Sequence, residues 1–546
     1  MGLCASKSVL APDKDGESLL QHTQGLGLDF WVRHHRSTTF QKPYIAAETL
    51  GQTSPGGDLL EREDTVWSED TAASTEYGDE HWAEDVSKRY ELRSVLGVGG
   101  TSSVHLAVDK MTGAQVAIKV QKRPIKEMHV SSLYNEILVG SQSWLRKSFP
   151  SGGLVKDCSF LCHSKGVFLT KHCYGIVMEA AMGGNLANYV CSTVGKHVDG
   201  RGNKTVTAIG EEQAKFIFKQ LVLGLQHMER NMHCVHRDIK LDNICIMSDS
   251  WKKERKNKPG GKYHCVGKVA YVDFQFATVV DDDGVTEFSG LLGTPVYMAP
   301  ELLALKFGGV RDSQRADAVE YDASKADIWA LGVTLVVMLV AGFPYDDVKP
   351  QTMEELEKSI YRLQQSQSWR RAKCVRPFLP YISKDCLNLI DGLLEFDPVK
   401  RLTVDQILQH PWMTKEFESK TMRRAWEGIM SEEEARGRQT QICLTKDVRE
   451  EEKAAILTKL EARNAAIKEM LLISTSTYDR NYSVLKRVRT EDQLERLKAH
   501  LEVFSRPEIA DLIDRRTFEH NHSLEIDLDM NKIYGVDGSH EKFAQR

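Results

Sequence analysis

The sequence predicts an α+β fold, in which short apolar segments with strand character come before longer helical segments. Apolar runs at residues 90–95, 104–108 and 116–119 have the length and composition of short buried strands. A helical pattern follows at residues 131–140, and helical composition returns near the end of the chain at residues 446–472. At 546 residues, the chain is long enough for one large domain with an extension at each end.

We place the large domain at residues 88–413, between an N-terminal arm of residues 1–87 and a C-terminal tail of residues 414–546. The arm contains 6 basic and 16 acidic residues and little sustained periodicity, which predicts a mostly disordered tether. The tail is charged and partly helical in composition, with a further candidate helix at residues 484–503. Within the large domain, Gly-, Ser-, Lys- and Asp-rich stretches are expected to be exposed loops, at residues 148–156, 192–209, 249–267 and 308–320.

Residues 236–243 form the most informative segment of the chain. Asp238 is placed to accept a proton from a hydroxyl group, Lys240 to contact a phosphate, and Asn243 to bind a divalent cation. Phosphoryl transfer asks a protein mainly for positioning and for neutralisation of spreading negative charge. These three side chains supply parts of both.

A glycine-rich turn lies between the first two apolar segments. Glycines allow backbone N–H groups to approach phosphate oxygens, because no Cβ stands in the way. The candidate nucleotide-binding residues of this turn are Leu96, Gly97, Val98, Gly99, Gly100, Thr101, Ser102, Ser103 and Val104.

A second group of charged residues lies at the ends of two other apolar segments and in the helical pattern between them. Lys119 ends a short apolar strand that also contains Ala117, and an unpaired buried charge is costly, so we expect Glu136 to be its partner. Asp273 follows an apolar strand at residues 269–272. Together with Asn243, Asp273 would supply the oxygen ligands that Mg²⁺ prefers.

These segments resemble, in the same order, the motifs of eukaryotic protein kinases. Residues 236–243 resemble the catalytic loop, residues 96–104 the glycine-rich loop, and Asp273, Phe274 and Gln275 the magnesium-binding Asp-Phe-Gly. Further downstream, residues 293–301 resemble the segment that ends in Ala-Pro-Glu. The remaining matches are Asp327, which in the family braces the catalytic loop; Arg401, which pairs with the position of Glu301; and His410, Pro411 and Trp412, which resemble a helix end in calcium- and calmodulin-regulated kinases.

The resemblance implies a bilobal protein kinase fold, with a small β-rich N-lobe and a larger helical C-lobe. It implies transfer of the γ-phosphate of ATP to protein substrates with Mg²⁺, and orientation of the ATP phosphates by Lys119 and Glu136. Met178 would stand at the back of the adenine pocket. Lys240 and Thr294 both match the serine/threonine form of the family.

Two departures from the family pattern support a rival interpretation, a kinase-fold scaffold or pseudokinase with weak or no phosphotransfer. Ser102 replaces the third glycine of the loop, and Gln275 replaces the glycine after Asp273 and Phe274. We expect Gln275 to reduce the freedom of this segment to flip, because a Cβ disfavours conformations open to glycine. Every charged catalytic group is nevertheless present, so the sequence favours the enzyme.

The activation segment offers two alternatives. Arg237 precedes the catalytic Asp238, as in kinases ordered by a phosphate on the activation segment, and Thr286 and Ser289 are the phosphorylation candidates. The segment is already acidic, so Glu287 and its neighbours could take the place of the phosphate.

The N-terminus carries an acylation pattern. Removal of Met1 exposes Gly2, Ser6 stands where the myristoylation pattern requires a hydroxyl, and Cys4 is a candidate for palmitoylation. One myristoyl chain gives only marginal binding and the arm is acidic, so a second acyl chain at Cys4 is the expected second signal. We therefore expect a cytoplasmic, membrane-associated protein on a cytosol-facing membrane, such as the inner face of the plasma membrane.

Other partners follow from the remaining features. The 11 cysteines indicate a reducing compartment, and the zinc-like set Cys158, Cys162, His163, His172 and Cys173 is expected to be scattered over both faces of two strands. Residues 527–531 begin like an EF-hand but lack its glycine and its glutamate, so direct calcium sensing is unsupported. No nucleic-acid partner is expected. The tail is left with three roles: inhibition in cis, recruitment of a regulatory partner, or oligomerisation.

Overall fold

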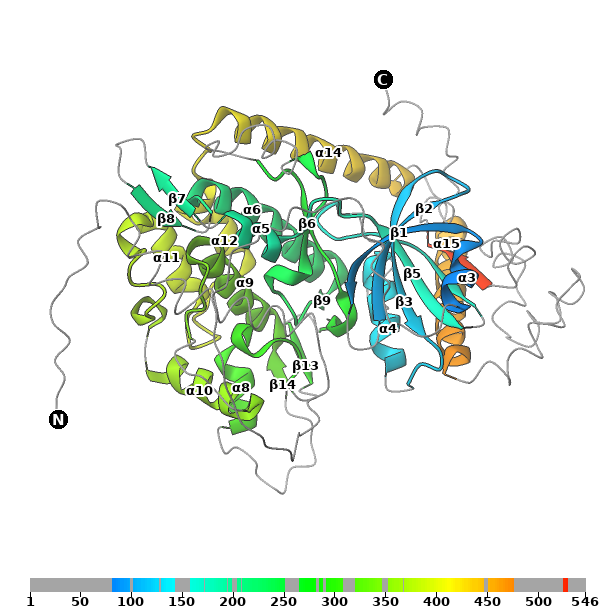
Figure 1. The fold of residues 1–546 in the computed structure, drawn as a ribbon, viewed down its shortest axis with the longest axis horizontal. Helices are drawn as coiled ribbons and strands as arrows, with labels where there is room; N and C mark the ends of the chain where they lie inside the picture. Colours follow the sequence, from blue (N-terminus) through cyan, green and yellow to red (C-terminus); the bar gives the residue numbers. More distant parts are fainter. Residues whose placement is uncertain are drawn as a thin grey trace, which may run out of the picture.

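The computed structural model describes most of the chain between residues 81 and 475 and one short segment near its end. The described ranges are residues 81–98, 102–126, 129–142, 158–170, 172–193, 195–198, 204–207, 209–250, 265–280, 284–287, 291–307, 320–345, 352–366, 368–445, 450–475 and 524–528. Figure 1 shows two lobes, a smaller one built on a β-sheet and a larger one built from helices. The predicted α+β, two-lobed arrangement is confirmed.

The smaller lobe is a six-stranded antiparallel sheet in the order β1-β2-β3-β5-β4-β15. A short helix, α3 (His81–Ser87), precedes it, and helix α4 (Val130–Gly140) packs against it. The strands are β1 (Tyr90–Val98), β2 (Ser102–Asp109), β3 (Gln115–Lys122), β4 (Ser164–Leu169), β5 (Cys173–Glu179) and β15 (Leu524–Asp527).

Strand alternation sorts the side chains of β3 between the two faces of this sheet. Val116, Ile118 and Val120 are buried together on one face, in an apolar cluster that includes Tyr90. Lys119 lies between them in sequence and therefore projects from the opposite face. The period of the strand is thus what turns Lys119 toward α4.

The larger lobe is organised around helix α9 (Ala323–Val340), which is almost entirely buried. Its length and composition would allow it to cross a membrane, but its burial among other helices is that of a core helix. Helices α6 (Glu211–His227) and α11 (Lys384–Leu393) pack against it. The other helices of this lobe are α5 (Leu186–Thr193), α8 (Pro300–Phe307), α10 (Met353–Ser366), α12 (Val404–Gln409) and α13 (Pro411–Thr414).

Short strands at the junction of the lobes carry the loops of interest. One three-stranded sheet contains β11 (Val269–Tyr271), β10 (Ile244–Ile246) and β6 (Gly184–Asn185). Two-stranded pairs are formed by β9 (Cys234–Val235) with β12 (Thr278–Val279) and by β13 (Val285–Glu287) with β14 (Glu320–Asp322). A last pair, β7 (Gly195–Val198) with β8 (Lys204–Thr207), falls in the stretch predicted to be an open loop, which is therefore partly a hairpin.

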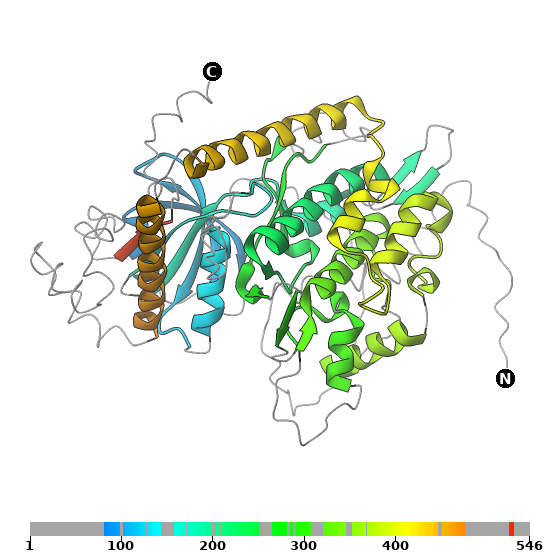
Figure 2. The same ribbon diagram turned by 180° about the vertical axis from the view of Figure 1, so that it is seen from behind.

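The C-terminal tail runs back over the kinase-like domain. Helix α14 (Lys420–Thr445) extends from the helical lobe toward the sheet, and helix α15 (Glu450–Ser474) lies along the smaller lobe (Figures 1 and 2). Helix α15 falls on the segment predicted to be helical at residues 446–472, but it begins four residues later and ends two residues later. The candidate helix at residues 484–503 lies outside the described residues.

The tail is joined to the smaller lobe by a shared core. Ile467, Met470 and Leu471 of α15 are buried in one apolar cluster with Leu133 and Ile137 of α4. Strand β15 supplies Ile526 and pairs with the edge of β4. The residues that begin like an EF-hand thus start in a strand of this sheet.

The candidate zinc ligands have separate surroundings. Cys173 Sγ lies 3.2 Å from the hydroxyl of Thr170, whereas Cys162 Sγ contacts the carbonyl of Glu179 at 3.7 Å. Among the described residues, no group of three or more His, Cys, Asp or Glu side chains is arranged to hold a metal ion.

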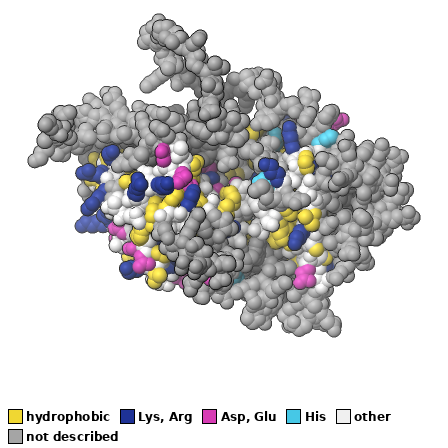
Figure 3. Space-filling view, turned by 90° about the horizontal axis from the view of Figure 1, so that it is seen from below, with side chains coloured by type: hydrophobic (Ala, Val, Ile, Leu, Met, Phe, Trp, Pro, Cys, Tyr) yellow, Lys and Arg dark blue, Asp and Glu magenta, His cyan; other side chains and the backbone are white. Residues whose placement is uncertain are grey.

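The surface seen from below carries mixed charge. Figure 3 shows Lys and Arg side chains over the described surface of the helical lobe, with acidic side chains between them. The described part of this face therefore does not present one sign of charge.

Candidate active site

The catalytic loop is fixed from beneath by Asp327 of α9. Its two carboxylate oxygens accept hydrogen bonds from the backbone N–H groups of His236, at 2.7 Å, and Arg237, at 2.9 Å. Arg237 has a φ of 62°, which a non-glycine residue adopts only when its surroundings hold it there. Burial raises the pKa of Asp327 to about 7, although the two backbone N–H groups stabilise its ionised form and act to lower the pKa.

Three side chains of this loop, Asp238, Lys240 and Asn243, form one hydrogen-bonded group with Thr294. Lys240 Nζ donates to Asp238 Oδ2 at 2.8 Å and to the hydroxyl of Thr294 at 2.9 Å, and that hydroxyl donates to Asp238 Oδ1 at 3.1 Å. Asn243 Nδ2 donates to the Asp238 carboxylate at 2.8 Å. Burial alone would lower the pKa of Lys240, but Asp238 raises it above its ordinary value, so this lysine is a fixed cation.

A second charged group comes from the smaller lobe. Lys119 Nζ lies 2.7 Å from Glu136 Oε1, which is the predicted ion pair, and 3.0 Å from Asp273 Oδ1. Burial opposes the charge on Lys119, but the carboxylates of Asp273 and Glu136 outweigh it and raise the lysine pKa. Burial likewise opposes ionisation of Asp273, yet Lys119 holds the pKa of this carboxyl below its ordinary value. Lys119 and Asp273 are therefore charged near neutral pH, whereas burial raises the pKa of Glu136 against the effect of Lys119.

The oxygen atoms available at this junction suit Mg²⁺. Asn243 makes its hydrogen bonds to Asp238 through Nδ2, which leaves its Oδ1 available as a ligand. The side chain of Asp273 keeps 30% of its surface exposed, so its carboxylate can take a ligand besides Lys119. Carboxylate and amide oxygens are what a hard divalent cation selects. The donor set fits the predicted ion.

The glycine-rich segment lies partly within the described residues. Gly97 pairs with Val104 and Val98 with Ser103 at the ends of β1 and β2, and Leu96 is half exposed. Gly99, Gly100 and Thr101 lie outside the described residues. Ser102 begins β2 as an ordinary strand residue, so its replacement of glycine leaves the strand pairing intact.

The adenine side of the predicted site is formed by paired strands. Met178 of β5 lies directly opposite Ala117 of β3 and is partly buried. Both residues belong to the pairing that continues to Lys119. The predicted adenine-side residues Ala117 and Met178 therefore lie in the same pair of strands as Lys119, two positions along β3.

Gln275 lies in a short 3₁₀ helix, Phe274–Phe276, that follows Asp273. Its φ is not among the left-handed values of the described residues, whereas Asp273 itself has a φ of 63°. A side chain at position 275 is thus compatible with this backbone, because only left-handed φ values favour glycine. The departure does not disturb the carboxylate of Asp273, and the reduced freedom to flip stays a prediction.

Two helix residues near Asp273 were not predicted. Ser132 donates to the backbone carbonyl of Gln275 at 2.8 Å, and Asn135 donates to that of Ala277 at 3.0 Å. The signal in the sequence is that Ser132 lies four positions before Glu136 and three before Asn135, spacings that place residues on one side of a helix.

The activation segment is only partly described. Thr286 lies in β13 opposite Tyr321 of β14, and Ser289 lies outside the described residues. Arg237 Nε donates to the carbonyl of Phe276 at 2.6 Å, and its side chain also bonds Tyr321. Both predicted alternatives for ordering this segment, a phosphate or an acidic side chain, stay predictions.

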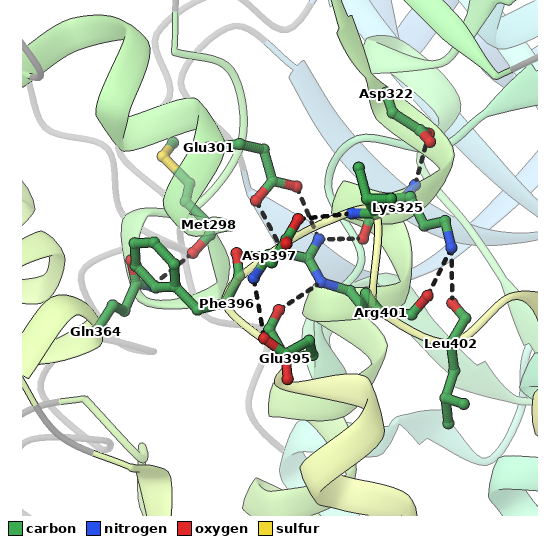
Figure 4. Close-up of polar contacts among 11 residues, drawn as sticks. Met298, Glu301, Asp322, Lys325, Gln364, Glu395, Phe396, Asp397, Arg401 and Leu402 are labelled. Carbon is green, nitrogen blue, oxygen red and sulfur yellow. Dashed lines mark hydrogen bonds and ion pairs between the residues drawn. The ribbon is translucent and has the colours of Figure 1, made fainter.

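The end of this segment is attached to the helical lobe by a buried ion pair. Figure 4 shows Arg401 between Glu301, Lys325 and Glu395. Arg401 donates two hydrogen bonds to the Glu301 carboxylate, and further ones to the backbone carbonyls of Lys325 and Glu395. The predicted pairing of Glu301 with Arg401 is confirmed.

The comparison with known families agrees with this geometry. The family model described as "Protein kinase domain" matches residues 90–413, more than half of the chain. The chain belongs to the protein kinase family. This kinase is an ATP-dependent enzyme, and the pseudokinase interpretation loses both of its supports, because Ser102 and Gln275 leave the charged groups in place.

Several curated proteins resemble this kinase over the same region. Serine/threonine-protein kinase SRK2E of Arabidopsis thaliana is 29% identical over 336 residues, which cover 62% of this chain and 74% of the relative. SRK2C of the same plant is 28% identical, over 60% of this chain and 76% of the relative. SAPK7 of Oryza sativa subsp. japonica is 26% identical, over 60% and 73%. Membership of the calcium/calmodulin-dependent group stays a prediction.

Proposed function

We propose that this kinase transfers the γ-phosphate of ATP to serine and threonine hydroxyls of protein substrates. The observation that carries the proposal is the contact network of Asp238, Lys240 and Thr294, with every link between 2.8 and 3.1 Å. The serine/threonine names of the relatives support the same acceptor class.

Each residue of the network has one task in this proposal. Asp238 orients the acceptor hydroxyl and takes its proton, while Lys240 neutralises charge on the phosphate that is being transferred. Thr294 holds both side chains in position through its hydroxyl. Lys119, fixed by Glu136, contacts the nucleotide phosphates. Bound Mg²⁺, held by Asn243 and Asp273, supplies neutralisation of phosphate charge.

Substitution of Lys240 tests this assignment. Lys240→Met removes a preorganised cation, so kcat is expected to fall about 100-fold with little change in the KM for peptide. The control is Lys400→Met, since Lys400 is exposed and forms only a surface pair with Asp397. Initial rates with serine, threonine and tyrosine versions of one peptide give the acceptor class. An unchanged kcat in Lys240→Met, or a preference for tyrosine, would contradict the proposal.

The membrane tether is a separate part of the proposal and rests on the N-terminal sequence alone. Myristoylation of Gly2 with palmitoylation of Cys4 would give two acyl chains, enough for stable membrane residence. Gly2→Ala should move the full-length protein from the membrane to the soluble fraction, and Cys4→Ser should do so partly. Unchanged fractionation of Gly2→Ala would contradict the tether. Both residues lie outside the described residues.

For the tail, we favour a role in cis as a brace of α4. The support is the apolar cluster that α15 shares with α4, on the helix that carries Glu136. Glu433 of α14 also accepts hydrogen bonds from the backbone N–H and hydroxyl of Ser159, at 3.0 and 2.5 Å. These contacts coexist with an intact Lys119–Glu136 pair. A regulatory partner would then act by displacing the tail from α4.

A further inference from the structure

We propose that Ser132 and Asn135 are positioning residues that hold the Asp273 segment against helix α4. The two bonds would fix one conformation of this segment, which a glycine at position 275 would leave free to flip. The proposal concerns how the Mg²⁺ ligand Asp273 is kept in place, and it goes beyond the assignment of the ligand itself.

The two contacts join parts of the chain that are far apart in sequence. Ser132 Oγ donates to the carbonyl of Gln275 at 2.8 Å, across 143 positions. Asn135 Nδ2 donates to the carbonyl of Ala277 at 3.0 Å, across 142 positions. Both side chains are partly buried, so water competes only weakly for these bonds.

The receiving carbonyls need donors from outside their own turn. The Phe274–Phe276 turn is a single 3₁₀ turn, closed by the hydrogen bond from the N–H of Ala277 to the carbonyl of Phe274. Carbonyls at the end of a turn have no following helical N–H groups to accept from. A partly buried carbonyl without a donor is costly. Ser132 and Asn135 provide the missing donors.

The same helix also reaches Asp273 through side chains. Asn135 is next to Glu136, which pairs with Lys119, and Lys119 in turn contacts Asp273. Helix α4 thus holds the Asp273 segment twice, once through the charged side chains and once through the backbone carbonyls. Displacement of α4 would release both connections together, which couples the helix position to the Mg²⁺ site.

This arrangement also accounts for Gln275. Ser132 contacts the backbone carbonyl of position 275, not its side chain, and the φ of Gln275 is one that any residue adopts. Phe274 is buried and its ring lies 5.4 Å from that of His236, which fixes the turn from the other side. A segment held in this way has no need of a glycine.

The test uses the full-length protein and four variants. Ser132→Ala and Asn135→Ala each remove one donor, and Asn135→Ala keeps the question answerable if Ser132→Ala does not fold. Ser131→Ala is the matched control, because Ser131 is exposed on the same helix. Ser132→Thr retains the hydroxyl and should restore wild-type behaviour.

Two measurements separate positioning from general stability. The first is affinity for ATP with Mg²⁺ and with EDTA; the second is amide hydrogen exchange of residues 274–277 without nucleotide. In each alanine variant, we expect the ratio of ATP affinity with Mg²⁺ to ATP affinity with EDTA to fall about threefold to tenfold, as for the loss of one hydrogen bond. Affinity in EDTA should stay unchanged, and the Ala277 amide should exchange faster. Ser131→Ala and Ser132→Thr should match the wild type.

The contrary results are equally specific. Equal loss of affinity with Mg²⁺ and with EDTA would overturn the proposal, because it would indicate a general structural role. Unchanged exchange at residues 274–277 in both alanine variants would overturn it as well.

Discussion

Arg401 and Glu301, 100 positions apart in the chain, are joined by two parallel hydrogen bonds: 2.7 Å from Nη1 to Oε1 and 2.9 Å from Nη2 to Oε2. The Arg401 side chain is fully buried, while that of Glu301 keeps 14% of its surface exposed. A buried guanidinium is tolerated only when its charge and its N–H groups are matched. The pair therefore attaches the end of the activation segment to the core of the helical lobe.

Removal of Glu301 should be strongly destabilising. Glu301→Ala leaves the buried charge of Arg401 without its partner, and we expect the free energy of unfolding to fall by about 3 kcal/mol or more. Urea unfolding followed by fluorescence measures this loss. Lys400→Ala is the control, because Lys400 is next to Arg401 but exposed, and it should change the midpoint little. A loss of less than about 1 kcal/mol in Glu301→Ala would show that solvent screens the pair as at a surface.

Asp327 should give the stability a specific dependence on pH. Burial raises the pKa of this carboxyl to about 7 in the folded protein, whereas an unfolded aspartate has a pKa of about 3.9. Between these values the folded state binds a proton that the unfolded state has lost, so stability from this group falls as pH rises. The Asp327→Asn variant lacks this pH-dependent contribution to stability. The stability of the variant minus that of the wild type should therefore rise from pH 5 to pH 7 and level off above pH 8.

Urea midpoints at pH 5, 6, 7 and 8 measure this difference. A difference that is constant over the whole range would mean that the two N–H groups of the catalytic loop already keep Asp327 ionised at pH 5.

Detachment of helix α15 should weaken ATP use. Leu471 is fully buried in the cluster shared with α4, so Leu471→Asp should release the tail and loosen Glu136. We expect the KM for ATP to rise severalfold and kcat to fall, measured by steady-state kinetics. Leu472→Asp is the matched control, because 45% of the surface of Leu472 is exposed. A gain of activity in Leu471→Asp would instead support an inhibitory tail.

The sequence was most informative where charged groups require partners. The pair of Lys119 with Glu136 was predicted because a buried charge must be matched. The pair of Glu301 with Arg401 and the support of the catalytic loop by Asp327 were implied by the family resemblance. The stated contacts of these residues were found as predicted.

The contacts of the tail were not predicted, because they depend on which surfaces meet in space. Apolar residues in α15 indicated a buried face, but nothing local showed that α4 covers it. For β15, a signal was present: Leu524, Ile526 and Leu528 alternate with charged residues, a period of two that is typical of a strand. Ser132 and Asn135 were missed because their acceptors are backbone carbonyls, which carry no sequence identity.

The most direct test of the account is transfer of labelled γ-phosphate from Mg-ATP to a serine-containing peptide by the wild type and by Asp238→Asn. Both proteins should bind ATP with similar affinity, because Lys119 and Asp273 are untouched. The account predicts steady labelling by the wild type and a loss of at least about 100-fold in the rate for Asp238→Asn. Equal rates from the two proteins would contradict the assignment of this loop as the catalytic centre.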